Sequence, residues 1–391
     1  MNTDVKRLHK IVREVAPTAI NLRRTIHANP ELGDQEHETT ALIDATLRDI
    51  GIRPRVRLGH TGLTADLGTT GTMIGFRADL DALPITELND LPFVSKNPGV
   101  MHACGHDGHT AIGLGIALVL SQYGELPGRA RFIFQPAEET FPGGAFDMVR
   151  EGVVNDLSAL VAFHMDPSLA VGKIGLKIGP ITSSSDRFEI TINGPGGHTA
   201  RPHETVDAVY AAGRVVTELP TLLNRTLDAR TPMSLVFGTI HGGRADNVIP
   251  TTVTMTGTVR ILDRETWDKM PDRVQSLVRD IVAPLGADAD VHYQRGIPPV
   301  VNDAGVLSEV EFAIHEVLGT QAVAETHASM GAEDFARFLD VVPGALMRLG
   351  SALPDRKVDL HSASFDIDED AIENGILVGA ASLLRLMQCE W

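Results

Sequence analysis

The segment 102–109, His-Ala-Cys-Gly-His-Asp-Gly-His, constrains this chain more than any other. It places a thiol, three imidazoles and a carboxyl group within eight residues. Gly105 and Gly108 allow the backbone to turn tightly, so that these side chains can converge on one point. Thiolate and imidazole together suit zinc, manganese, cobalt or nickel. The chain is therefore expected to fold so that this segment lies at a metal site.

Composition narrows the class of protein. A chain of 391 residues is too long for one ordinary core, which predicts two domains. The formal net charge of −17 argues against nucleic acid or an anionic membrane as a partner. Two cysteines are too few for a disulfide framework, and the first residues lack the pattern of a secretory signal. No run approaches the roughly 18 apolar residues of a membrane helix. We expect a cytoplasmic protein.

Helical and strand patterns alternate up to residue 184, which predicts an α/β domain with a mainly parallel sheet. The helices are expected at 4–28, 35–49, 111–121 and 143–151, and the strands at 72–78, 131–134 and 160–163. The strands deliver polar residues at their carboxyl ends: Asp79 and Asp81, Glu138 and Glu139, and His164. Ligands gather at such ends in open α/β sheets.

The pattern changes near residue 185. Strands at 187–192, 234–240, 251–261 and 290–294 alternate with helices at 205–219 and 265–282. The order β-α-β-β-α-β is the split, ferredoxin-like arrangement. We expect 185–296 to be an inserted α+β domain. The first domain is then discontinuous, formed by 1–184 and 297–391, with a strand at 345–349 and a last helix at 369–387.

Five motifs occur along the chain: HACGHDGH (102–109), QPAEE (135–139), GGHTARPH (196–203), NVIP (247–250) and LHS (360–362). Together they resemble the metallopeptidase M20 family over essentially the whole chain. The similarity is closest to its amidohydrolase branch, which contains N-acyl-amino-acid, hippurate and auxin-conjugate hydrolases. This resemblance implies a catalytic domain of the dinuclear metallo-exopeptidase type, with an inserted domain for dimerisation or as a lid.

The resemblance also implies two divalent metal ions per subunit, of zinc, manganese, nickel or cobalt. Their ligands would be Cys104 in the bridging position with His106, Glu139, His164 and His361. Glu138 would stay uncoordinated as general base and acid, moving a proton from metal-activated water to the leaving nitrogen. The opposite assignment of the two glutamates stays open.

Several further roles follow less directly. In other branches an early aspartate orients a metal-binding histidine. Here the alternatives are that Asp107 takes this role or that no residue does, and Asp79 and Asp81 are less secure candidates. His109, like His102, either supports a metal ligand or is a packing residue.

The resemblance implies that His198, in the inserted domain, reaches into the partner subunit's site and stabilises the oxyanion. Asn247 is expected to hold a polar group of the substrate or the same oxyanion. Arg201, Arg244 and Arg260 are candidates for the substrate carboxylate, because a guanidinium matches a carboxylate bidentately. The sequence does not choose among them.

The predicted function is a metal-dependent amidohydrolase, an aminoacylase-like enzyme that cleaves the amide bond of small N-acyl or N-aroyl amino acids. A metallo-dipeptidase or carboxypeptidase is the alternative, as is a hydrolase of another small aromatic amide or amine. The same resemblance predicts a homodimer or a dimer of dimers.

Overall fold

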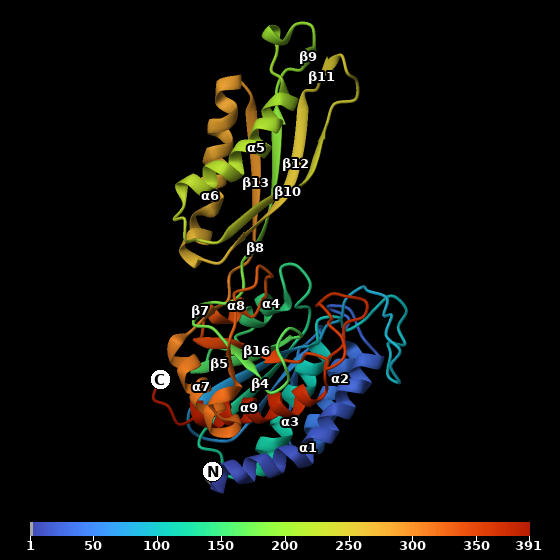
Figure 1. Ribbon diagram of the computed structural model, residues 1–391, viewed down its shortest axis with the longest axis vertical. Coiled ribbons are helices and arrows are strands. Elements are labelled where there is room, and N and C mark those ends of the chain that lie inside the picture. Colours follow the sequence, from blue (N-terminus) through green and yellow to red (C-terminus); the bar gives the residue numbers. More distant parts are fainter. Residues whose placement is uncertain (1–2) are drawn as a thin grey trace. The chain divides into compact units, whose positions relative to one another are not determined.

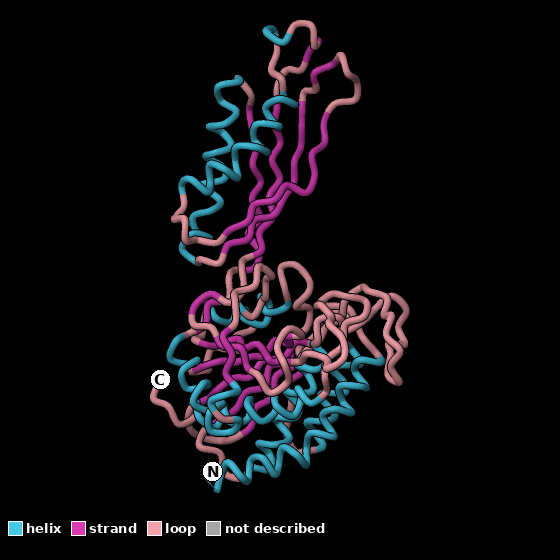
Figure 2. The backbone as a smooth tube through the Cα atoms, viewed as in Figure 1, coloured by secondary structure: helices cyan, strands magenta, loops and turns pink. Residues whose placement is uncertain are grey.

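The computed structural model describes residues 3–391, which form two compact units (Figures 1 and 2). The first unit comprises residues 1–179, 301–327 and 334–391, of which 1 and 2 lie outside the described part. The second comprises 180–300 and 328–333. The α/β class predicted from the sequence is confirmed.

An eight-stranded mixed sheet forms the first unit, in the order β1-β2-β4-β3-β5-β16-β6-β15. The four central strands β4, β3, β5 and β16 are mutually parallel, whereas β2 and β6 run antiparallel to them on either side. The bounds of its strands are β1 Arg55–Val56, β2 Leu63–Leu67, β3 Met73–Asp79, β4 Arg129–Gln135, β5 Ala159–Asp166, β6 Ile174–Leu176, β15 Val323–Glu325 and β16 Gly344–Gly350.

Helices cover this sheet. On one face α1 packs against α3, α3 against α9, and α9 against α7, while α4 and α8 pack together on the other (Figure 1). Their bounds are α1 Thr3–Ala28, α2 His37–Asp49, α3 His106–Tyr123, α4 Gly144–Arg150, α7 Ala304–Leu318, α8 Ala336–Leu339 and α9 Asp370–Leu386, with a 3-10 turn η3 at Thr320–Ala322. None of the helices described is long and apolar enough to cross a membrane.

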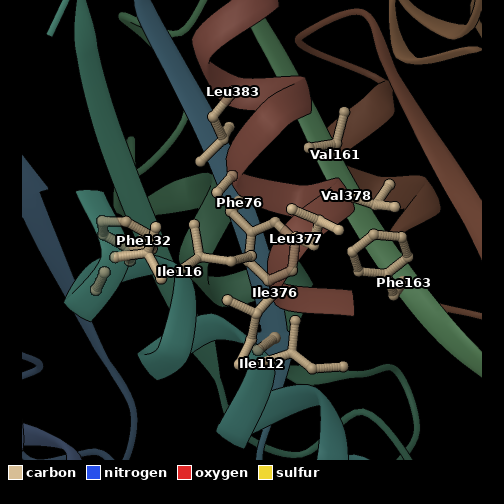
Figure 3. Packing of buried hydrophobic residues seen from close by; sticks show 14 of the residues in the cluster. Phe76, Ile112, Ile116, Phe132, Val161, Phe163, Ile376, Leu377, Val378 and Leu383 are labelled. Atoms are coloured by element: carbon tan, nitrogen blue, oxygen red, sulfur yellow. The ribbon is translucent and has the colours of Figure 1, made fainter. Parts of the chain in front are cut away.

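The core of the first unit lies between the central strands and α3 and α9. Aromatic and branched side chains from β3, β4 and β5 interdigitate there with isoleucines and leucines of the two helices (Figure 3). Every residue of α3 from His106 to Leu120 is buried, which a helix apolar on only one face would not allow. The predicted start of this helix at residue 111 is wrong: it begins at His106, directly after Gly105, whose φ is +87°.

The second unit has an antiparallel sheet in the order β10-β12-β8-β13, with α5 and α6 on one of its faces (Figure 1). The elements follow the predicted β-α-β-β-α-β order. Their bounds are β8 Ser185–Asn193, α5 Ala208–Thr226, β10 Met233–Gly242, β12 Thr252–Ile261, α6 Arg264–Val282 and β13 Asp288–Ile297. Two short strands, β9 Gly197–His198 and β11 Val248–Ile249, pair separately, and 3-10 turns occupy Pro202–Glu204 and Ala283–Leu285. Strands β7 Gly179–Pro180 and β14 Val301–Asn302 lie where the chain leaves and re-enters the first unit.

Candidate metal centre

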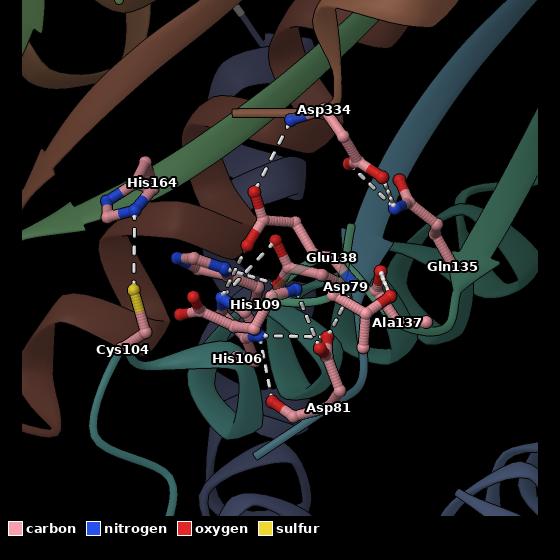
Figure 4. A network of polar contacts seen from close by, with 12 residues as sticks. Asp79, Asp81, Cys104, His106, His109, Gln135, Ala137, Glu138, His164 and Asp334 are labelled. Carbon is pink, nitrogen blue, oxygen red and sulfur yellow. Dashed lines mark hydrogen bonds and ion pairs between the residues drawn. The ribbon is translucent and has the colours of Figure 1, made fainter. Parts of the chain in front are cut away.

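The central parallel strands bring polar residues to one edge of the sheet. β3 ends at Asp79, opposite Gln135 at the end of β4, and β5 carries His164 near its end. Because parallel strands have their carboxyl ends at the same edge, the segments that follow them converge there (Figure 4).

Three left-handed residues shape the loops of this edge. Gly105, with φ +87°, turns the chain between Cys104 and the first residue of α3, His106. Ala137, with φ +57°, precedes Glu138. His361 itself has φ +61°, and its backbone N–H donates to the carbonyl oxygen of Ala103 at 2.7 Å. Glycine adopts this conformation freely, but a residue with a Cβ rarely does, so the turns at Ala137 and His361 are held by their surroundings.

The potential ligand atoms form one connected cluster. Atoms of Cys104, Glu139 and His361 lie within 4.8 Å of one another, as do atoms of His106, Glu138 and Glu139. The Nε2 of His361 lies 3.0 Å from Oε1 of Glu139. The Sγ of Cys104 lies 3.7 Å from Nε2 of His164. All five ligands predicted from the sequence, and Glu138, are thus brought together.

Hydrogen bonds turn one nitrogen of each buried imidazole toward this cluster. The Nδ1–H of His106 donates to the carbonyl oxygen of Asp81 at 2.8 Å, and that of His164 donates to the carbonyl oxygen of Met165 at 2.8 Å. Since a carbonyl only accepts, Nδ1 carries a hydrogen in both rings. The Nε2 of His106 is buried without a hydrogen-bond partner among residues 3–391. A thiol, imidazole Nε2 atoms and a carboxylate presented in this way fit a transition-metal ion.

Burial controls the protonation of these groups. It raises the pKa of the Cys104 thiol to about 12, although His106 acts to lower this pKa, and so favours the thiol. Burial lowers the pKa of His164 well below its usual value, and the charge of Arg348 lowers it further. For His106 burial also acts to lower the pKa, but Asp79, Asp81 and Cys104 together outweigh it and raise the pKa well above the usual value. Without a cation, Cys104 and His106 therefore hold protons.

Asp81 fixes the backbone of the two glutamates, a role that the sequence did not reveal. Its Oδ1 accepts from the N–H of Glu138 at 3.0 Å, and its Oδ2 accepts from the N–H of Glu139 at 2.8 Å. Its carbonyl oxygen also holds His106. One buried aspartate thus orients three neighbouring members of the cluster.

His109 lies between the other imidazoles of the cluster. Its Nδ1–H donates to Oδ1 of Asp79 at 2.7 Å, and its Nε2 accepts from the N–H of Met165 at 2.8 Å. Its ring centroid lies 5.5 Å from that of His106 and 5.4 Å from that of His164. Both nitrogens are used, so His109 supports the ligands from behind.

The carboxyl group of Asp107 bonds to residues of α1. Its Oδ2 accepts from Nε of Arg23 at 2.7 Å and from Nδ1 of His27 at 2.8 Å, both on α1. These bonds connect the start of α3 to α1, and the hydrogen bond that orients His106 comes from Asp81. His102 is fully buried, and neither of its nitrogens has a hydrogen-bond partner among the described residues. Burial lowers its pKa to about 4, which leaves a neutral ring.

Sequence reasoning missed a buried network beneath Glu138. Arg77 bonds to Asp79 at 2.6 Å and to Asp334 at 2.9 Å, and Asp334 accepts from Gln135 at 2.8 Å. The backbone N–H of Asp334 points to Oε1 of Glu138 at 3.4 Å. An arginine within an otherwise apolar strand pattern was the available signal, because a buried guanidinium requires carboxylate partners.

The remaining predicted residues belong to the second unit. His198 and Asn247 meet where β9 pairs with β11, and the N–H of Thr199 donates to the carbonyl oxygen of Asn247 at 3.3 Å. His198 and Arg201 line a surface depression of about 500 Å³. Arg260 lies at the opposite end of β12 and donates to the carbonyl oxygen of Met330 at 3.0 Å. Within this unit Arg201 and Arg260 therefore do not converge.

Comparison with known proteins decides the family. The sequence profile described as "Peptidase family M20/M25/M40" matches residues 75–385. The chain belongs to this M20 family. It is accordingly a hydrolase that acts on amide bonds, and the predicted resemblance is confirmed.

Individual relatives cover almost the whole of this M20 member. An N-acetyl-L-cysteine deacetylase of Bacillus subtilis is 39% identical, over 90% of this chain and 84% of the relative. Thermostable carboxypeptidase 2 of Saccharolobus solfataricus is 37% identical, over 97% and 98%. The crystal structure of Bacillus subtilis YxeP, described as a dinuclear metal-binding peptidase of the M20 family, matches with a TM-score of 0.85 and 35% identity, over 96% and 99%.

The link between α1 and α3 generates a prediction about pH. Burial acts to lower the pKa of His27, but Asp107 and Glu87 outweigh it and raise the pKa to about 9. A histidine with a raised native pKa stabilises the fold fully below its unfolded pKa of about 6.5, and this contribution is lost as the pH rises through about 9. The free energy of unfolding, measured by denaturant titration, should fall between pH 7 and 10 in the wild type. In His27→Gln the slope should be flatter; an equal slope would contradict this account.

Proposed function

We propose that this protein is a dinuclear metal-dependent amidohydrolase that releases the amino acid from small N-acyl or N-aroyl amino acids. The observation that carries the proposal is the buried cluster itself. Two overlapping groups of ligand atoms share Glu139, and one of them includes Glu138, whose Oε1 also lies 3.4 Å from the backbone N–H of Asp334. A relative named for the deacetylation of N-acetyl-L-cysteine supports this class of substrate.

In this proposal the two ions would be held by Cys104, His106, Glu139, His164 and His361. Two ions supply Lewis acidity that acidifies water and polarises the amide carbonyl. Zinc, manganese, cobalt and nickel all suit a set of one thiolate, three imidazoles and one carboxylate. Asp81 and His109 act behind the ligands by fixing the imidazole orientations.

Glu138 moves the proton. It is 8% exposed, its Oε1 accepts weakly from the N–H of Asp334, and its Oε2 lies 3.9 Å from Nε2 of His106. A carboxylate beside the cluster takes the proton of the attacking water and delivers it to the amide nitrogen as the C–N bond breaks. Glu139, which lies 3.0 Å from His361, is the better placed of the two glutamates to coordinate.

The second unit supplies the substrate contacts, as a domain for dimerisation and as a lid. His198 is exposed, and its Nδ1 accepts from the N–H of Ala200 at 3.1 Å, which leaves Nε2 to donate to an oxyanion. Asn247 holds a polar group of the substrate or the same oxyanion. Arg201 is the favoured partner for the substrate carboxylate, because it shares a depression with His198, and Arg260 is the second candidate. A cytoplasmic location remains part of the proposal.

Cleavage of a peptide bond by the same site is the second candidate, because one relative is named a carboxypeptidase. A panel of acetyl, benzoyl and indoleacetyl amino acids, dipeptides and small aromatic amides separates the two. Preference for N-acyl amino acids supports the proposal, and preference for dipeptides or for amides without a carboxylate contradicts it.

The role of Glu138 predicts a defect in the chemical step alone. Glu138→Gln keeps the shape of the side chain but cannot take a proton, so kcat should fall by about 100- to 10,000-fold. The metal content, measured by atomic emission, should stay near that of the wild type. In Glu139→Gln, by contrast, metal affinity should fall as well. A Glu138→Gln protein with wild-type kcat would refute the mechanism.

The protonated state of Cys104 predicts proton release on metal binding. A cation has to displace the thiol proton, so calorimetric titration with Mn²⁺ or Zn²⁺ in buffers of different ionisation enthalpy should show protons released, and affinity should rise with pH. Cys104→Ala should bind more weakly and release fewer protons. Equal proton release by the two proteins would exclude Cys104 as a ligand.

A role of His198 across subunits predicts complementation. His198→Ala should lower kcat by about 100- to 1,000-fold, as expected for the loss of one oxyanion donor. Mixed dimers of His198→Ala and Glu138→Ala subunits should then regain activity, since one of their two sites is intact. Mixed dimers verified by tagged co-purification that stay inactive would count against this role.

A further inference from the structure

We propose that Glu36, a buried residue just before α2, is a positioning residue that aims Glu138 and Glu139 by holding Ala137 in its left-handed conformation. This inference rests on the proposed function. Glu36 is 0% exposed and more than 100 positions away from the residues that it orients.

The contacts of Glu36 point at the loop after β4. Its Oε1 accepts from the backbone N–H of Ala137 at 2.7 Å, and its Oε2 accepts from the hydroxyl of Thr61 at 2.6 Å. Thr61 is 2% exposed and Ala137 is 1% exposed, so no water competes for these bonds. Burial raises the pKa of Glu36 to about 7, and Oε1 can accept from Ala137 whether or not the other oxygen carries a proton.

The side chain of Glu36 is not needed by its own helix. It occupies the N-cap position of α2 but makes no capping bond. Glu31 takes over that task, accepting from the N–H of Glu38 at 3.0 Å and from that of Thr39 at 2.8 Å. A helix start whose cap is supplied from elsewhere leaves Glu36 available for the loop.

Glu36 and Asp81 together bind three successive backbone N–H groups. Glu36 takes that of Ala137, and Asp81 takes those of Glu138 and Glu139. Consecutive N–H groups around a left-handed residue form a concave site for negative charge, and here two buried carboxylates occupy it. The direction of the peptide before Ala137 is therefore set by Glu36, and the directions of the two peptides on either side of Glu138 are set by Asp81.

The loop after β4 is closely packed against its neighbours, including the segment before α2. A Cβ on Gly33 would lie 2.5 Å from Cγ2 of Thr140, and one on Gly144 would lie 2.0 Å from the carbonyl oxygen of Pro136. The segment before α2 thus lies directly under the loop. A φ of +57° is unfavourable for alanine because of its Cβ, and the bond to Glu36 compensates for it.

The test compares four variants for kcat, KM, thermal stability and affinity for Mn²⁺. Glu36→Ala should lower kcat and weaken Mn²⁺ binding, each by about 10- to 100-fold, with little change in KM. Glu36→Gln should stay much closer to the wild type, because its amide oxygen can still accept from Ala137 while its amide nitrogen faces Thr61. Adding Ala137→Gly to Glu36→Ala should restore part of both losses, because glycine adopts a positive φ without penalty.

Leu47→Ala is the matched control. Leu47 is a fully buried residue of α2, so its truncation should lower thermal stability while kcat and Mn²⁺ affinity stay unchanged. The proposal is overturned if Glu36→Ala alters stability alone, as Leu47→Ala does, or if Ala137→Gly restores nothing. If Glu36→Ala does not fold, the proposal is tested with the Glu36→Ala/Ala137→Gly protein and with Glu36→Gln. A Glu36→Gln protein as defective as a Glu138→Gln protein overturns the proposal. A wild type that binds Mn²⁺ but hydrolyses no substrate of the panel would refute the proposed function, and the Mn²⁺ affinities would still test Glu36.

Discussion

The burial of Cys104 among imidazoles and carboxylates is the interaction on which the rest of this site depends. A thiol in this position keeps its proton, because desolvation raises its pKa to about 12. The Nε2 of His106, which has no hydrogen-bond partner in the described part of the chain, raises the same difficulty, since buried polar atoms without partners are costly. Glu139 adds a carboxylate beside them, 3.0 Å from Nε2 of His361. A cation satisfies all three groups at once. The fold therefore buries a group of side chains that a bound cation would stabilise.

The carboxylates around the cluster are of two kinds, those that face it and those that bond to other groups of the protein. Glu138 and Glu139 face the cluster, whereas Asp81 and Glu36 are turned to backbone N–H groups. Arg77 similarly engages Asp79 and Asp334. Because the supporting acids already have donors, they do not compete for a cation.

The sequence predicted the ligands better than the structure that holds them. Cys104, His106 and the two glutamates occur in short motifs whose resemblance to the family implied that they converge, and the structure brings their atoms close together. The start of α3 at His106 did not follow, because Gly108 and His109 weaken a helical pattern that burial on all sides allows. The short strands β1, β6 and β15 likewise have too few residues to show a period.

Long-range polar bonds escaped prediction for a different reason. Glu36 appears in the sequence as one acid among several before a helix, and only the fold shows that Glu31 caps that helix while Glu36 reaches Ala137. The same holds for Asp107, which is adjacent to His106 in sequence yet bonds to Arg23 and His27 on another helix. Arg201 and Arg260 looked equivalent as well, but Arg260 lies near the end of β12, whereas Arg201 follows β9, which pairs with β11 before the start of β12.

A site of this kind requires rigidity in its backbone more than in its ligands. His361 is half-exposed, but its backbone is tied to Ala103, next to Cys104, and its φ of +61° leaves few alternatives. Ala137 is tied in the same way through Glu36. Left-handed residues fixed by a hydrogen bond at the peptide N–H set the direction of a side chain with little dependence on that side chain's own contacts. The direction of the candidate ligands therefore depends little on the contacts that they make with one another, and a cation can replace those contacts.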